Sequence, residues 1–198
     1  MKRLLLLLLL LLGACVQMHA RQGYWDYEDN HYAESYFQYL PAVGAVGLAF
    51  LGPEARDGLG SRIWMLGLGA LTEVAVVRGL KHYVDEERPD GSALNSFPSG
   101  HTATAFMGAE LLRHEYGWAW GAGAYAVAGA VAACRVNHRR HYWWDTVAGA
   151  GVGILSAQVG IALNGLRLRW LGRDASLALV PVADPVLKCY GARFNCVF

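Results

Sequence analysis

Five apolar stretches, joined by short polar connectors, set the strongest limit on what this chain can fold into. Their length and their lack of sustained strand-like alternation predict helices. The connectors contain Gly, Pro and charged residues, which typically end helices. At 198 residues the chain is most simply one domain, and 24 glycines and a 55% hydrophobic composition allow a well-packed core. The predicted helices cover approximately residues 35–52, 62–83, 100–115, 117–137 and 142–165.

Three charge-free runs, residues 35–53, 116–134 and 146–166, have the length of a membrane span, about 20 residues. The stretch 62–83 is different, because it contains Glu73 and Arg78, whose charges are costly in lipid. The sequence therefore leaves two arrangements open, an integral helical bundle and a compact domain at the envelope surface. In either one, the four-residue spacing of Gly149 and Gly153 suits close helix packing.

The N-terminus, "MKRLLLLLLLLLGAC", has two cations, a leucine run and then small residues. This pattern predicts an export signal at residues 1–14, too short for a typical span. "LGAC" is similar to a bacterial lipobox, which predicts Cys15 as a lipidated first mature residue. An ordinary signal cleaved later, for example after Ala20, is the alternative. Residues 15–39 then form a lead-in that mixes aromatic and acidic residues.

The C-terminal tail, residues 167–198, contains the first strand-like stretch, "SLALVPV", and two cysteines. In an exported protein Cys189 and Cys196 can form a disulfide; two unpaired thiols are the alternative. Cys134 stands in an apolar run and is expected to be a small core residue. The net charge of +1 gives no indication of a nucleic-acid partner.

Residues 81–89, "KHYVDEERP", place two cations seven positions apart. In a helix Lys81 and Arg88 would share a face, and Pro89 marks a helix end near Arg88. Two cations there can hold an oxyanion. Alternatively, they pair with the three acidic residues between them on a solvated face.

Residues 96–106, "SFPSGHTATAF", turn through Pro98, Ser99 and Gly100 into a predicted helix. Gly100 lets a ligand approach the backbone, and the N–H groups of a helix start favour an anion. His101 can then donate a proton to a leaving oxygen. Ser99 as an ordinary N-cap is the simpler alternative.

Residues 134–145, "CRVNHRRHYWWD", place His141 and Asp145 four positions apart. On a helix the carboxylate can bond one imidazole nitrogen and leave the other as a nucleophile. Arg135 adds a planar cation suited to phosphate. A basic loop at a membrane surface, with Trp143 and Trp144 in the interface, is the alternative.

Taken together and in this order, the three motifs resemble the signature of the type 2 phosphatidic acid phosphatase (PAP2) superfamily, which includes bacterial acid phosphatases and vanadium haloperoxidases. The resemblance runs from about residue 40 to 166. Cys134 departs from the serine that usually precedes the arginine. The resemblance implies an all-α bundle of five to six helices with the site at the helix ends.

The resemblance also implies a role for each residue. Its predicted phosphate ligands are Lys81, Arg88, Ser99, Gly100 and Arg135. His141 would attack phosphorus and form a phosphohistidine, with Asp145 orienting it. His101 would protonate the leaving group and then activate water. The cations would supply the charge stabilisation, so no metal or other cofactor is implied.

The expected activity is therefore a metal-independent phosphatase in the bacterial envelope, with its site facing the periplasm. The expected substrate is a phosphomonoester or pyrophosphate, and a lipid phosphate is favoured. Three alternatives are a vanadate-dependent haloperoxidase, a non-catalytic phosphate-binding protein and a metal site at His138, His141 and Asp145. The arginines beside these last residues would repel a metal cation.

Overall fold

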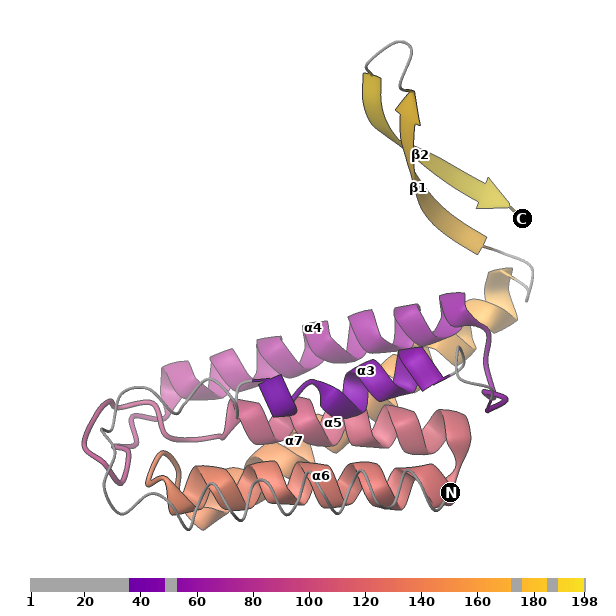
Figure 1. The fold of residues 1–198 in the computed structure, drawn as a ribbon. Coiled ribbons are helices and arrows are strands. Elements are labelled where there is room, and N and C mark those ends of the chain that lie inside the picture. Colours follow the sequence, from indigo (N-terminus) through magenta and orange to yellow (C-terminus); the bar gives the residue numbers. More distant parts are fainter. Residues whose placement is uncertain (1–35, 49–52, 172–175, 185–188, 198) are drawn as a thin grey trace.

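The computed structural model describes residues 36–48, 53–171, 176–184 and 189–197. Its helices run lengthwise as a bundle (Figure 1). Their bounds are α3 (Leu40–Gly47), α4 (Leu59–Tyr83), α5 (Gly100–Tyr116), α6 (Trp118–Asn137) and α7 (Trp143–Leu171). The all-α prediction for the main domain is confirmed. The predicted signal peptide (1–14), Cys15 and the lead-in up to residue 35 lie outside the described residues.

The four longer helices match the predicted stretches closely, and differ mainly at one end. α7 extends six residues beyond the predicted end at 165. The helix continues past residue 165 because the charged side chain of Arg167 has hydrogen-bond partners there. Its guanidinium donates to Asn164 Oδ1 at 3.0 Å and to Ser61 Oγ on α4 at 3.1 Å. α3 is shorter than predicted, with eight residues.

α5 is the central helix and packs against α3, α4, α6 and α7. α7 approaches its neighbours closely through glycines. A Cβ at Gly149 would collide with the carbonyl oxygen of Ser99, and one at Gly153 with that of Ala103. The predicted close packing at Gly149 and Gly153 is thus confirmed, and it brings the N-terminal ends of α5 and α7 into contact.

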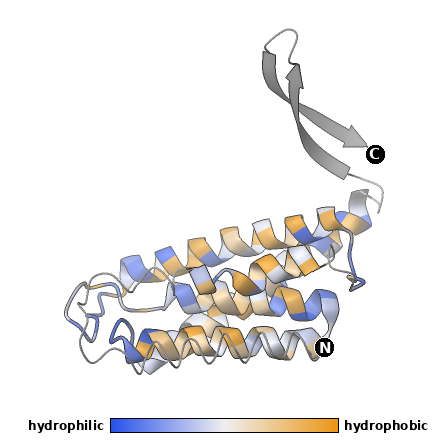
Figure 2. Ribbon diagram, viewed as in Figure 1, coloured by the Kyte–Doolittle hydropathy of each residue, from blue (hydrophilic) through white to orange (hydrophobic). Residues whose placement is uncertain are grey.

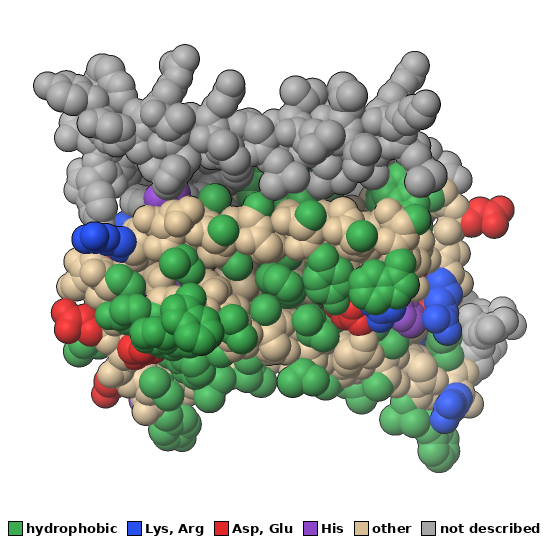
Figure 3. Space-filling model, turned by 90° about the horizontal axis from the view of Figure 1, so that it is seen from below, with side chains coloured by type: hydrophobic (Ala, Val, Ile, Leu, Met, Phe, Trp, Pro, Cys, Tyr) green, Lys and Arg blue, Asp and Glu red, His purple; other side chains and the backbone are tan. Residues whose placement is uncertain are grey.

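The core is built mainly from small residues and two buried methionines, Met65 and Met107. Many other large apolar side chains lie on the outside, and Leu71 and Leu155, for example, are 68% and 67% exposed. Figure 2 shows hydrophilic residues gathered at the two ends of the bundle. Apolar side chains are spread along the described part of the face in Figure 3, and charged side chains lie mainly toward its two ends.

Three helices are long and apolar enough to cross a membrane: Leu59–Tyr83, Trp118–Asn137 and Trp143–Trp170. The first of these contains Glu73, which was expected to be costly in lipid. Its side chain is 5% exposed and lies inside the bundle, away from the outer apolar surface. The predicted spanning run 35–53 contains only the eight-residue α3 within the described residues.

The C-terminal tail forms an antiparallel hairpin of β1 (Ser176–Asp184) and β2 (Cys189–Val197). Cys189 and Cys196 both lie on β2, near its two ends. The side chains of these two cysteines lie outside the described part of the structure, so the predicted Cys189–Cys196 disulfide stays a prediction.

Candidate active site

The predicted site residues come together at one end of the bundle. There, the connector between α4 and α5 (residues 84–99) meets the connector between α6 and α7 (residues 138–142) (Figure 1). His101 lies in the first turn of α5 and Arg135 in the last turn of α6. Charged residues that are far apart in sequence therefore share one polar end.

The start of α5 is held against the start of α7. The backbone N–H of Ser99 donates to the carbonyl oxygen of Asp145 at 3.0 Å. Ser99 occupies the N-cap position, but its hydroxyl makes no capping bond and lies 3.0 Å from Thr102 Oγ1. The first N–H groups of α5 are thus not used by a capping side chain, which favours the anion-site interpretation over a simple N-cap.

His141 and Asp145 form the predicted pair, although not within one helix. α7 begins at Trp143, so His141 precedes the helix and Asp145 lies in its first turn. The distance from His141 Nδ1 to Asp145 Oδ2 is 3.6 Å. The backbone N–H of Tyr142 donates to the same oxygen at 2.9 Å. Nδ1 faces the carboxylate, and this leaves Nε2 as the nitrogen available for chemistry.

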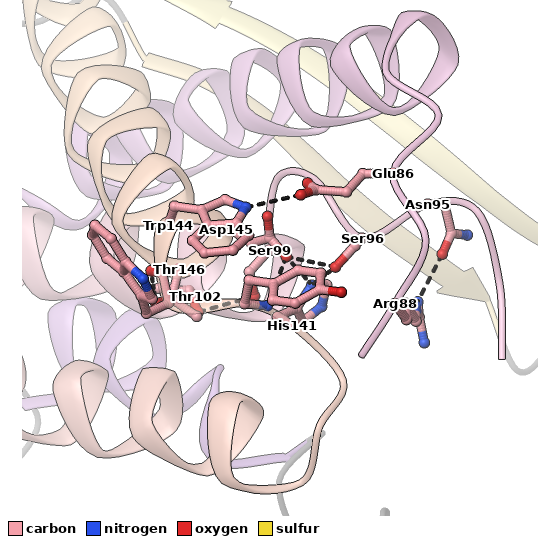
Figure 4. A network of polar contacts seen from close by, with 12 residues as sticks. Glu86, Arg88, Asn95, Ser96, Ser99, Thr102, His141, Trp144, Asp145 and Thr146 are labelled. Carbon is pink, nitrogen blue, oxygen red and sulfur yellow. Dashed lines mark hydrogen bonds and ion pairs between the residues drawn. The ribbon is translucent and has the colours of Figure 1, made fainter. Parts of the chain in front are cut away.

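Ser96 completes this pair and was not among the predicted site residues. Its hydroxyl donates to Asp145 Oδ2 at 2.5 Å and lies 3.5 Å from His141 Nδ1 (Figure 4). Ser96 and Asp145 are both fully buried. The other carboxylate oxygen, Oδ1, has no hydrogen-bond partner among the described residues. Asp145 is therefore held through one oxygen by groups from both connectors.

Lys81 and Arg88 meet through a common neighbour. Lys81 Nζ donates to the backbone oxygen of Asn95 at 2.5 Å, and Arg88 Nε donates to Asn95 Oδ1 at 3.0 Å. α4 ends at Tyr83, so Arg88 lies on the connector, and the two cations do not share a helical face. The connector folds back instead and brings them to the same end of the bundle.

The electrostatics show that the three predicted cations surround both histidines. Burial, together with the charges of Arg135, Arg88 and Lys81, lowers the pKa of His101 to about 4. Burial also lowers the pKa of His141, again with contributions from the same three cations, while Asp145 opposes the shift. Both imidazoles are therefore neutral at pH 7, and the site presents a net positive field to an anion.

Trp144 connects the two loops from the outside. Its indole Nε1 donates to Glu86 Oε1 at 2.8 Å (Figure 4). Its ring stacks on Tyr142 with centroids 4.5 Å apart. Trp143, by contrast, is 64% exposed. The predicted interfacial position fits Trp143, whereas Trp144 also fastens the connector 84–99 to α7.

Two further predictions concern neighbours of this site. Cys134 is half-buried on α6, directly before Arg135. Among the described residues, the group with ligand atoms close enough for a metal ion is Asp57, His114 and Glu115, at the other end of α5. In the described part of the chain, His138, His141 and Asp145 do not form such a group.

An all-α bundle with a histidine–carboxylate pair and a cation cluster at its helix ends defines a class of phosphate-handling proteins. The model of the PAP2 superfamily matches residues 62–168, more than half of the chain. The chain therefore belongs to the PAP2 superfamily, as its motifs predicted.

Two individual proteins are similar to the chain. The lipid A 1-phosphatase of Porphyromonas gingivalis is 36% identical over 137 residues, which cover 67% of this chain and 31% of that protein. The chain thus spans about a third of the length of this relative. The crystal structure of Aquifex aeolicus LpxE matches with a TM-score of 0.51 and 21% identity, over 68% of this chain and 88% of that one. At this identity the structural match supports the fold alone.

Proposed function

We propose that this protein is a metal-independent phosphatase that hydrolyses lipid phosphomonoesters or pyrophosphates through a phosphohistidine. The observation that carries the proposal is the His141–Asp145–Ser96 arrangement beside Lys81 and Arg88. Family membership and the 36% identity to a lipid A 1-phosphatase support the same reaction class.

In the first step the cations Lys81, Arg88 and Arg135 hold the phosphoryl oxygens, together with the first N–H groups of α5. Nε2 of neutral His141 attacks phosphorus, a P–N bond forms, and the P–O bond to the leaving group breaks. Asp145 accepts the Nδ1 proton in a hydrogen bond and stabilises the positive charge that develops on the ring. His101 donates its proton to the departing oxygen.

In the second step His101 acts as a base. It takes a proton from water, the water oxygen attacks phosphorus, and the P–N bond breaks to release inorganic phosphate and neutral His141. Because the pKa of His101 is about 4 in the open site, its proton must arrive with the substrate. A phosphate monoanion carries that proton, and the bound anion opposes the three cations that lower the pKa of His101.

A lipid substrate is supported by the position of the site relative to the apolar surface. The site lies where α4 ends and α7 begins, and both helices are candidate membrane spans. We infer that the bundle is integral to the bacterial envelope membrane and that the polar end, exported by the N-terminal signal, faces the periplasm. Lipidated Cys15 would be the mature N-terminus; mass spectrometry of that terminus tests it, and an unmodified residue beyond Cys15 would refute it.

The function is tested with the purified full chain in detergent and a substrate panel. The panel contains phosphatidic acid, phosphatidylglycerol phosphate, undecaprenyl diphosphate, lipid A and the soluble p-nitrophenyl phosphate. We expect release of inorganic phosphate, with a higher kcat/KM for at least one lipid than for the soluble ester. Absence of phosphate release from every member of the panel would contradict the proposal.

A further inference from the structure

A second polar cluster lies at the opposite end of the bundle from His101. There, the connector between α3 and α4 passes the C-terminal end of α5. Asp57 on the connector meets His114 and Glu115 of α5, and one ligand atom from each lies within 4.8 Å of the others. His101 and His114 are thirteen residues apart on one helix, which corresponds to about 20 Å.

Hydrogen bonds hold these three residues in place. The backbone N–H of Asp57 donates to Glu115 Oε2 at 3.0 Å. The backbone N–H of Arg56 donates to the carbonyl oxygen of Glu115, also at 3.0 Å. His114 Nε2 lies 3.5 Å from Asp57 Oδ2. Arg56 and Asp57 are thus held against the end of α5 by their backbone N–H groups.

Glu115 is the unusual member of the cluster. It is only 4% exposed, and its Oε1 is buried without a hydrogen-bond partner among the described residues. A buried carboxylate oxygen normally has a partner, because leaving it unsatisfied is unfavourable. One carboxylate oxygen of Glu115 lies within 4.8 Å of the ligand atoms of Asp57 and His114, so a cation bound there would give this buried carboxylate a partner.

The surroundings also favour a cation. The three residues lie at the C-terminal end of α5, where the carbonyl dipoles are negative. Of the nearby arginines, Arg56 and Arg62 still place positive charge near the Glu115 carboxylate, but their side chains are exposed or bonded to other groups. Arg113 forms a 2.6 Å pair with Glu110. Arg62 Nη1 donates to Val46 O at 3.0 Å and to Tyr116 Oη at 3.1 Å. Arg56 is exposed.

We propose that Asp57, His114 and Glu115 bind one divalent transition-metal ion, of which Zn²⁺ is the best match. One imidazole nitrogen and two carboxylate oxygens suit zinc, and water would occupy the fourth tetrahedral position. The ion fastens the α3–α4 connector to the end of α5. It is a structural site remote from the phosphate chemistry, and its presence does not depend on the proposed function.

The test is zinc binding by the full chain in detergent, after treatment with EDTA and removal of the chelator. Isothermal titration with ZnCl₂ should show one ion per chain, and zinc should raise the thermal unfolding temperature. Glu115→Gln and His114→Ala should each weaken zinc binding at least about tenfold. The matched controls are Glu54→Gln, an exposed carboxylate of the same connector, and His82→Ala, an exposed imidazole at the other end. Both should bind zinc as the unmodified protein does.

If Glu115→Gln fails to fold, Asp57→Asn on the half-exposed connector replaces it in the same titration. The proposal is overturned if the unmodified chain binds no zinc, or if zinc affinity is unchanged in the Asp57, His114 and Glu115 variants. The zinc-free protein should still hydrolyse p-nitrophenyl phosphate. The zinc titration and the phosphatase assay therefore succeed or fail independently.

Discussion

The hydroxyl of Ser96 donates a 2.5 Å hydrogen bond to Asp145 Oδ2, the same carboxylate oxygen that faces His141 Nδ1. The two residues come from different connectors and both are fully buried. Ser96 thus fixes the carboxylate that orients the proposed nucleophile. Ser96 is a positioning residue. Its hydroxyl lies 3.5 Å from His141 Nδ1, the nitrogen that faces Asp145, rather than at Nε2, the nitrogen proposed to react.

Ser96→Ala should lower kcat by about tenfold to a hundredfold with little change in KM. A hydrogen bond to a charged group is worth about 1.5–3 kcal/mol, and this one orients the nucleophile rather than binding substrate. Steady-state kinetics on p-nitrophenyl phosphate measure the split. Ser92→Ala, in the same connector but away from Asp145, should have nearly normal kcat. An unchanged kcat in Ser96→Ala would remove Ser96 from the account.

Gly149→Ala should destabilise the protein by about 1–3 kcal/mol and reduce activity, because its methyl group meets the Ser99 carbonyl where α5 and α7 touch. Gly151→Ala is the matched control on the same helix, since nothing lies within 4 Å of a Cβ there. It should be neutral or stabilising by up to about 1 kcal/mol. Thermal unfolding in detergent compares the two variants. Equal behaviour would show that the glycine contact does not hold the site together.

On the alkaline side, the pH profile of kcat/KM should follow the ionisation of the substrate phosphate. His101 and His141 are neutral above pH 4 in the free enzyme, because burial and the three cations lower the pKa of each. The reactive form therefore pairs neutral histidines with a phosphate monoanion, whose second pKa is about 6. We expect kcat/KM to fall above pH 6 and to hold between pH 6 and pH 4.

A substrate with a more acidic phosphate separates this account from an ordinary histidine titration. The alkaline limb should move to lower pH with the second pKa of that phosphate. Two results would show that the histidines titrate at their ordinary pKa. One is an alkaline limb of the kcat/KM profile at the same pH for both substrates, and the other is an acid limb near pH 6.5.

Activity should survive EDTA and should be inhibited by vanadate. The cation cluster supplies the charge stabilisation in this account, and vanadate resembles a phosphoryl group with five ligands. Initial rates before and after chelation, with and without vanadate, make the comparison. Loss of activity on chelation, restored by a divalent metal and seen also in His114→Ala, would show that the chemistry needs a metal ion.

Much of this architecture is predictable from the sequence because apolar stretches and connector composition are local signals. The starts and ends of α5 and α6 follow directly from Pro98–Gly100 and from the glycines and charges that flank each helix. The glycine spacing at Gly149 and Gly153 likewise predicted the close packing that the structure shows.

The rest depends on how the connectors fold, which no short-range pattern specifies. Ser96 and Asn95 have no periodic spacing, and their roles arise only when the connector turns back toward Asp145 and Arg88. The pairing of His141 with Asp145 was argued from helical spacing, but α7 begins two residues after His141. The sequence signal available for Ser96 was its place at the start of "SFPSGH". That place, just before the turn, did not distinguish Ser96 from an ordinary loop residue.

The most direct test of the central claim is to trap the phosphoenzyme in His101→Ala. This variant lacks the base for the second step and the acid for the first, and general acid catalysis is worth about 10²–10⁴-fold. Because nitrophenolate leaves without much help from a proton, p-nitrophenyl phosphate should still give a rapid burst followed by slow turnover. Peptide mapping of the rapidly quenched protein should then locate an acid-labile phosphate on His141, and His141→Ala should give neither burst nor phosphopeptide. A phosphate on any other residue, or a burst in His141→Ala but not in His101→Ala, would contradict the roles assigned to the two histidines.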